Sequence, residues 1–201
     1  DAFDFTAEMY AEGHSFFTYT SDSVDSLSSC CRLRNEIQEN EFSYTLGAGG
    51  VSTGSKGVMT ININRLVQNA VRNGIDISEA VKEQVEKVHK YLLAFNEIIK
   101  DEFESRLLGV YDAGYISLDK QYLTVGINGF VEGAEFLGIE ISPNEKYYEY
   151  GEKILKPIYD LNKRDKTKDV MFNTEFVPAE NLGVKNAKWD KEDGYVVPRD
   201  C

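Results

Sequence analysis

The pattern of apolar residues predicts one long amphipathic helix near the middle of the chain. Asp76 and Glu79 have the spacing of a capping box, which marks the start of a helix. We expect this helix to reach as far as Leu108 and to pack against a sheet, with His89 off the apolar stripe and in solvent. The stripe recurs in steps of four and three residues, which places its members on one helix face: Val81, Val85, Val88, Leu92, Phe95 and Ile99.

Shorter patterns around that helix predict strands and helices in alternation. Runs of β-branched residues predict strands, and a helical pattern follows each of the first two. The order strand, helix, strand, helix is typical of the α/β fold class. Proline interrupts helices, so the last of the predicted helices should end or kink at Pro157. The strands are predicted over residues 58–63, 123–128 and 171–176, and the helices between Asn64 and Gly74, over residues 130–137 and from Ser142 onward.

The N-terminal part of the chain gives weaker signals. Residues 1–20 favour a short helix, a turn at Gly13 and a strand over residues 16–20. Residues 21–40 are rich in Ser, Asp, Asn and Glu, whose side chains bond to nearby backbone and favour a loop. The glycine-rich loop at residues 47–57 comes close to a phosphate-binding motif. That motif needs a helix directly after it, and a strand is predicted here, so we reject a phosphate-binding loop.

Composition narrows the class of protein. A chain of 201 residues with 42% hydrophobic residues suits one globular domain or a large piece of one. Its net charge of -12 argues against nucleic-acid and anionic-membrane partners, because no basic surface exists to neutralise phosphates. No apolar run approaches the roughly 20 residues of a membrane span, and the acidic start does not resemble a signal peptide. We therefore expect a cytoplasmic protein.

The cysteines and histidines limit the chemistry. Cα atoms of the neighbours Cys30 and Cys31 lie about 3.8 Å apart, which is shorter than the roughly 4.4–6.8 Å of disulfides. With Cys201 the number is odd, so a secreted disulfide scaffold is unfavourable. His14 and His89 stand in no recognisable Cys/His context, which disfavours a cysteine protease and a zinc site. These residue types leave either small buried cysteines or a reactive cysteine on a polar loop, and no bound metal is expected.

One stretch resembles a known family. SDSVDSLSSCCRLRN, followed by FSYTLGAGGVSTGSKGVMTININRL, is similar to the active-site region of anaerobic (class III) ribonucleoside-triphosphate reductases, which belong to the glycyl-radical enzymes. The resemblance continues in LTVGINGFVEGAEFLG and in VPAENLGVKNAKWDKEDGYVVPRDC. It covers nearly the whole chain in the expected order.

The resemblance implies a fold. Members of this family form a ten-stranded α/β barrel of the ribonucleotide reductase type, with a finger loop that carries the active cysteine through its centre. Residues 1–201 are then expected to be a single segment of the catalytic barrel, with the finger loop at about residues 21–40. The glycyl-radical motif, the paired CxxC zinc site and the N-terminal part of the family are absent from this sequence. The chain alone is therefore expected to be an inactive fragment with exposed strand edges.

The resemblance also implies a reaction, the reduction of ribonucleoside triphosphates to deoxyribonucleoside triphosphates for DNA synthesis. A glycyl radical in the remaining part of the reductase is generated with S-adenosylmethionine by an iron–sulfur activating protein, and converts a cysteine of this segment to a thiyl radical. The thiyl removes the 3′-hydrogen, water leaves from C2′, and formate or a redoxin supplies electrons. The full enzyme is expected to be an allosteric homodimer, and this segment to bind no metal.

The resemblance assigns residues to this reaction. Cys31, directly before the arginine, maps to the radical carrier, and Cys30 is the alternative, because neighbouring side chains of an extended pair point to opposite sides. The expected substrate-binding residues are Arg32, Ser55, Asn62, Asn128, Gly129 and Glu180. Each has a structural alternative: loop positioning for Arg32, a turn for Ser55, a helix cap for Asn62, packing for Asn128 and Gly129, and stabilisation of a predicted loop for Glu180.

Two other functions remain open at this point. One is a different glycyl-radical enzyme of the pyruvate formate-lyase type, where adjacent cysteines also occur, although SLSSCCRL and TININR fit it poorly. The other is a catalytically silent fragment that acts as a folding or interaction module. A CxxC pair and a glycyl-radical motif downstream in the parent gene would favour the reductase.

Overall fold

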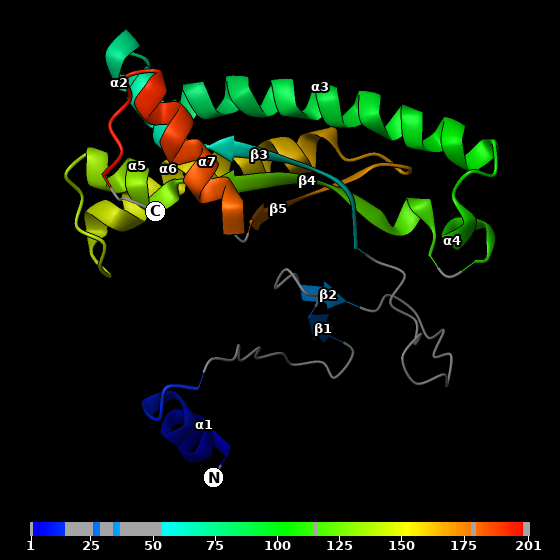
Figure 1. Cartoon of the computed structure of the whole chain (residues 1–201), viewed down its shortest axis with the longest axis horizontal. Coiled ribbons are helices and arrows are strands. Elements are labelled where there is room, and N and C mark those ends of the chain that lie inside the picture. Colours follow the sequence, from blue (N-terminus) through cyan, green and yellow to red (C-terminus); the bar gives the residue numbers. More distant parts are fainter. Residues whose placement is uncertain are drawn as a thin grey trace. The chain divides into compact units, whose positions relative to one another are not determined.

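The computed structural model describes residues 2–14, 26–28, 34–36, 54–114, 116–177 and 180–198. The chain divides into two compact units, the N-terminal unit of residues 1–40 and the C-terminal unit of residues 41–201 (Figure 1). Among the residues described, no helix is both long and apolar enough to cross a membrane.

The N-terminal unit contains one helix and one small antiparallel ladder. Helix α1 (Ala2–Ala11) and the turn at Gly13, where φ is +88°, confirm two predictions. Strands β1 (Ser26–Ser28) and β2 (Arg34–Glu36) pair antiparallel. The prediction of a loop throughout residues 21–40 is therefore wrong in part, because backbone groups assigned to local side-chain bonds instead pair in a ladder. Cys30, Cys31, Arg32 and the predicted strand at residues 16–20 lie outside the described residues.

The C-terminal unit is built on a parallel sheet with strand order β3-β4-β5. The three strands are β3 (Gly54–Asn62), β4 (Gln121–Asn128) and β5 (Met171–Phe176). Each overlaps a predicted strand, but β3 begins at Gly54, so residues 54–57 of the predicted glycine-rich loop belong to the strand. Asn62 lies opposite Asn128, and Gly126 lies opposite Glu175. The α/β prediction is thus confirmed. Among the strands described, β3 and β5 each pair on one side only, and this small sheet is not by itself a ten-stranded barrel.

The two faces of the sheet differ in polarity, as the alternation of side chains along a strand requires. Leu123, Val125 and Ile127 of β4 are at most 1% exposed and belong to the hydrophobic core under the helices. Thr124 and Asn128 alternate with them and therefore lie on the opposite face, which we call the polar face. Figure 1 shows helix α3 running alongside the sheet on the helical side, where it packs on α6.

The helices of the C-terminal unit follow the strands in the predicted order. Helix α3 begins at the predicted cap, since Asp76 accepts hydrogen bonds from the backbone N–H groups of Ser78 and Glu79, but it ends at Glu104, before Leu108. The helical elements are α2 (Ile63–Asn73), α3 (Ile77–Glu104), α4 (Gly109–Asp112), the 3-10 helix η1 (Leu118–Lys120), α5 (Phe130–Phe136), α6 (Glu145–Asp165) and α7 (Glu180–Glu192).

Two sequence predictions about these helices are wrong, and one of the two alternatives for Pro157 is excluded. Helix α6 does not end at Pro157 but continues through it, with Ile154 and Ile158 fully buried on both sides of the proline. Glu180 begins helix α7 instead of lying on a loop. His89 is only 2% exposed and stacks on Phe172 with ring centroids 4.0 Å apart. His89 is buried because it contacts α6 and β5, and the spacing of apolar residues within α3 carries no information about these contacts.

Candidate functional site

The carboxyl ends of β3 and β4 bring two predicted site residues together. Asn62 and Asn128 are register partners at the last position of each strand. Gly129 follows with φ at +72°, a conformation that favours glycine. An added Cβ at Gly129 would also stand 3.1 Å from Asn62 Oδ1 and 3.2 Å from the backbone nitrogen of Asn64. Glycine therefore allows the two strand ends to approach, at the edge where open α/β sheets bind ligands.

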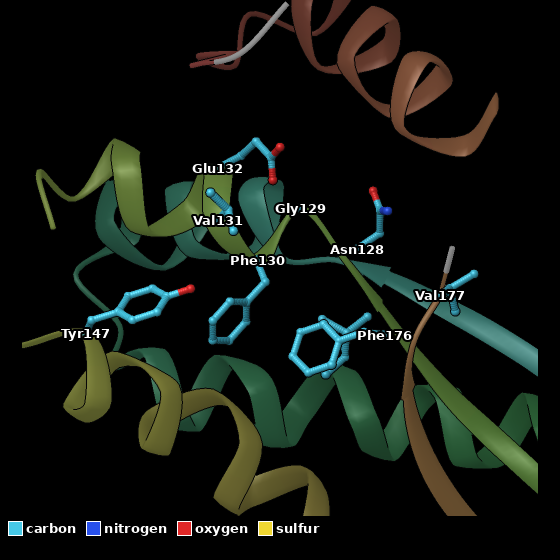
Figure 2. Close-up of a pocket in the computed structure, with 9 residues that line it drawn as sticks. Asn128, Gly129, Phe130, Val131, Glu132, Tyr147, Phe176 and Val177 are labelled. Atoms are coloured by element: carbon cyan, nitrogen blue, oxygen red, sulfur yellow. The ribbon is translucent and has the colours of Figure 1, made fainter. Parts of the chain in front are cut away.

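A cavity of about 370 Å³ opens beside these strand ends. Figure 2 shows the rings of Phe130, Tyr147 and Phe176 gathered on one side of it, whereas Asn128 points away from them. Phe130 meets Tyr147 and Phe176 edge to face, with ring centroids 6.1 and 5.4 Å apart. The cavity thus combines an aromatic wall with the amide of Asn128 and the carboxylate of Glu132, and small-molecule sites favour such apolar walls with a few polar groups.

Helix α7 lies against the same strand ends through one face. Gly183, Asn186, Ala187 and Asp190 share this face by their spacing. Together with Asn62, Asn128 and others they line a second cavity of about 30 Å³. The two small residues allow close approach, and the two polar ones reach the asparagines of the strands.

Asp190 is the centre of a buried hydrogen-bond network. Its side chain is 2% exposed and accepts from Asn62 Nδ2 at 3.1 and 3.0 Å, from Asn64 Nδ2 at 3.0 Å and from Arg65 Nε at 2.8 Å. Burial alone would lower the pKa of Arg65, but its hydrogen bonds to Asp190 and Asp193 outweigh this and raise the pKa. The guanidinium therefore stays charged and fixes the start of α2 to α7.

Asn62 uses its whole side-chain amide inside the protein. Oδ1 accepts from the backbone N–H of Arg65 at 3.1 Å, so Asn62, and not Asn64, is the N-cap of α2. Its Nδ2 donates to Asp190. This geometry matches the helix-cap alternative for Asn62.

Asn128 has a different arrangement. Its Oδ1 accepts a hydrogen bond from Asn186 Nδ2 at 3.0 Å. Within the described ranges, no acceptor binds the Nδ2 of Asn128. This NH₂ group is therefore a donor available at the strand end.

Ser55 lies at the other end of the sheet. Seven residues of strand separate it from Asn62, which corresponds to about 23 Å. Its Oγ accepts from Thr124 Oγ1 at 2.7 Å, and Thr124 Oγ1 also lies 2.6 Å from Asn173 Oδ1. The structure does not bring Ser55 together with Asn128 and Gly129. Glu180 starts the helix that carries Asn186 and Asp190.

Glu175 of β5 is a polar residue that the sequence reasoning missed. It is 7% exposed, and its Oε1 is buried without a hydrogen-bond partner among the described residues. Its register partner Gly126 belongs to the polar face, because a Cβ there would stand 2.6 Å from Thr60 Oγ1. The alternation in MFNTEF, with Phe172 and Phe176 on one side, was the signal that places Glu175 with Asn128 on the polar face.

No group of three His, Cys, Asp or Glu side chains is placed to hold a metal ion in the part of the chain that the structure describes. The remaining predicted site residues, Cys30, Cys31 and Arg32, lie outside this part.

Comparison with known proteins decides the family. A family model described as anaerobic ribonucleoside-triphosphate reductase matches residues 1–200. The chain belongs to this family. No curated protein sequence matches the reductase chain.

Solved structures of anaerobic ribonucleotide reductases are similar to this member of the family. The Thermotoga maritima enzyme with glycerol in the active site is 28% identical, with a TM-score of 0.68 over 85% of this chain and 29% of that chain. The same enzyme with dATP and CTP is 28% identical, with a TM-score of 0.63 over 69% of this chain and 25% of that chain. This chain of 201 residues therefore spans about a quarter of the length of these solved reductases.

Proposed function

We propose that this chain is a segment of the catalytic barrel of an anaerobic ribonucleoside-triphosphate reductase, and that the complete enzyme reduces ribonucleoside triphosphates to deoxyribonucleoside triphosphates. The family match over residues 1–200 carries this proposal. The outer edges of β3 and β5, which pair with no other strand among the residues described, support it, since a parallel sheet needs further strands to close a barrel. So does the solved relative whose description names dATP and CTP.

In this proposal the stretch of about residues 21–40 is the finger loop, and Cys31 is the thiyl carrier, with Cys30 as the alternative. The glycyl radical belongs to another part of the enzyme and supplies the one-electron oxidation of the thiol. The thiyl sulfur then accepts the hydrogen atom from C3′, which forms an S–H bond and leaves a carbon radical. Water departs from C2′, and formate or a redoxin supplies the two electrons that complete the reduction.

The described residues contribute binding and orientation. Gly129 allows the ends of β3 and β4 to approach each other, and the NH₂ group of Asn128, which has no acceptor among the described residues, donates to a substrate oxygen. Glu175 offers a carboxylate on the polar face as a proton acceptor for a ribose hydroxyl, and its Oε1 has no hydrogen-bond partner in the described part of the chain. Arg32, Ser55 and Glu180 are retained as further substrate contacts within the complete barrel, whereas the amide of Asn62 is engaged by the cap of α2 and by Asp190.

The same proposal includes the partners of the complete enzyme and its cellular compartment. The partners are the rest of the reductase, an activating protein that uses S-adenosylmethionine, and a second copy in an allosteric homodimer. The compartment is the cytoplasm, and the product serves DNA synthesis. This segment itself needs no metal.

Replacement of the proposed radical carrier tests the function. In the complete enzyme, Cys31→Ser should abolish deoxynucleotide formation, because a serine hydroxyl does not form the required radical. The glycyl radical should still appear in the electron paramagnetic resonance spectrum after anaerobic activation. Cys30→Ser is the matched control and should retain turnover. Retained activity of Cys31→Ser would exclude Cys31, and loss only in Cys30→Ser would move the role to its neighbour.

A further inference from the structure

The hydrogen bond between Asn186 and Asn128 gives the amide of Asn128 a direction. An asparagine side chain carries one acceptor oxygen and one NH₂ donor, so a partner on one determines where the other points. Asn186 Nδ2 donates to Asn128 Oδ1 at 3.0 Å, which turns the oxygen of Asn128 toward α7. The NH₂ group of Asn128 is left without an acceptor in the described part of the chain.

The position of Asn128 at a cavity makes the orientation of its amide relevant to a ligand. Asn128 lines both the cavity of about 370 Å³ and the smaller one, whereas Asn186 lines only the smaller one. Asn62, the register partner of Asn128, has both ends of its amide engaged. Of the two strand-end asparagines, Asn128 is therefore the one whose NH₂ group has no acceptor among the residues described.

We propose that Asn186 is a positioning residue that holds the Asn128 amide so that its NH₂ group donates to an oxygen of the bound ribonucleoside triphosphate. The inference rests on the proposed function for the identity of the ligand. The geometry of α7 supports it: Asn186 and Asp190 lie one turn apart on the same face and bind neighbouring strand ends, Asn128 and Asn62. Helix α7 thus fixes the side-chain orientation of both asparagines, and its two residues do so from outside the larger cavity.

A role in packing alone and a role in orientation predict opposite results for two variants. Asn186→Asp keeps the size of the side chain but offers only acceptor oxygens. The Asn128 amide must then turn its NH₂ group toward the introduced carboxylate and its oxygen toward the substrate. Asn186→Ala removes the partner and leaves the amide free to adopt either orientation. Orientation therefore predicts the larger loss for Asn186→Asp, and packing predicts it for Asn186→Ala.

Binding of labelled CTP to the complete reductase, measured by equilibrium dialysis, is the test. We expect Asn186→Asp to weaken CTP binding about tenfold or more, because a polar substrate atom loses its donor and faces an acceptor, and Asn186→Ala about threefold. Asn181→Asp, an exposed change of the same kind on α7, is the matched control and should bind as the unmodified enzyme does. A larger loss for Asn186→Ala, no loss in either variant, or a loss in Asn186→Asp that disappears at high salt would overturn the proposal.

A second measurement does not depend on the proposed function. With selective ¹⁵N-asparagine labelling, the side-chain NH₂ of Asn128 should exchange rapidly with solvent in the unliganded enzyme and become protected in Asn186→Asp. A protected NH₂ in the unmodified protein would overturn the orientation, whatever the enzyme binds. If this spectrum is as expected but the unmodified enzyme neither binds nor reduces CTP, the proposed function fails, and the assigned amide orientation stands.

Discussion

Asp190 accepts hydrogen bonds from the same Asn62 amide nitrogen through both of its carboxylate oxygens, at 3.1 and 3.0 Å. The two residues are 128 positions apart, and the contact joins the last turn of α7 to the end of β3. Because Asn62 also caps α2, one buried carboxylate links three elements around the strand ends. The chain that follows is held there too, since Val196 exchanges backbone hydrogen bonds with the side chain of Gln68.

Asp190→Asn should destabilise the protein strongly, although the aspartate and asparagine side chains have nearly the same size. The neutral amide offers one acceptor oxygen to a group of three N–H donors, and its own NH₂ group faces other donors. We expect the free energy of unfolding to fall by about 2–4 kcal/mol, the range for removing one partner of a buried charged network. Urea unfolding followed by circular dichroism measures this change.

Asp193→Asn is the control for that experiment. Asp193 also pairs with Arg65, at 2.8 Å, but its side chain is 56% exposed. An exposed ion pair contributes about 1 kcal/mol or less. Equal losses from the two variants would show that burial of Asp190 does not matter and would contradict the network described above.

The carboxylate of Asp165, which contacts the buried His89, should make the free energy of unfolding depend on pH. Asp165 Oδ2 lies 2.8 Å from His89 Nδ1, and the hydrogen bond from Arg164, with a smaller contribution from His89, holds the pKa of Asp165 below its usual value. The folded state thus favours the ionised carboxylate. Its contribution is complete above about pH 4, the value for an unfolded aspartate, and is lost as the pH falls below that.

Asp165→Asn should therefore lower the free energy of unfolding near pH 7 by about 1 kcal/mol, a modest amount because the side chain is partly exposed. The difference from the unmodified protein should shrink as the pH decreases below about 4. Asp160→Asn, on an exposed position of the same helix, should show no such trend. Unfolding curves at several pH values measure both, and a difference independent of pH would refute the role of ionised Asp165.

Local patterns in the sequence were sufficient for most of the fold. The Asp76 cap, five of the six residues in the apolar stripe of α3 and the strand at residues 171–176 each depend on residues close in sequence, and the structure confirms them. The sixth residue of the stripe, Phe95, is 43% exposed, so its predicted place on the buried face is wrong. The prediction for His89 is wrong because the environment of this residue comes from other elements. His89 Nε2 finds its partner Asn162 Oδ1 73 residues away, at 2.8 Å.

The candidate site could be predicted only in part for the same reason. Asn128 and Gly129 follow from the rule that parallel strands end in ligand sites. The contacts that orient them come from α7, at separations of 58 residues for Asn186 and 126 for the pair of Asp190 with Asn64. No helical pattern around residue 186 indicates which strand end it meets, and the sequence predicts no helix there.

Replacement of Glu175 should change the stability of the protein and the activity of the complete enzyme in opposite directions. Its carboxylate is nine-tenths buried, and one oxygen has no partner among the described residues, so removal of the negative charge should not cost stability. We expect Glu175→Gln to raise the free energy of unfolding by about 1 kcal/mol, as often occurs at functional sites. In the complete enzyme the same change should lower CTP reduction about tenfold or more, because the amide does not accept a proton. Glu149→Gln, at an exposed position of α6, should change neither quantity. A less stable Glu175→Gln variant with full turnover would assign Glu175 to the fold alone.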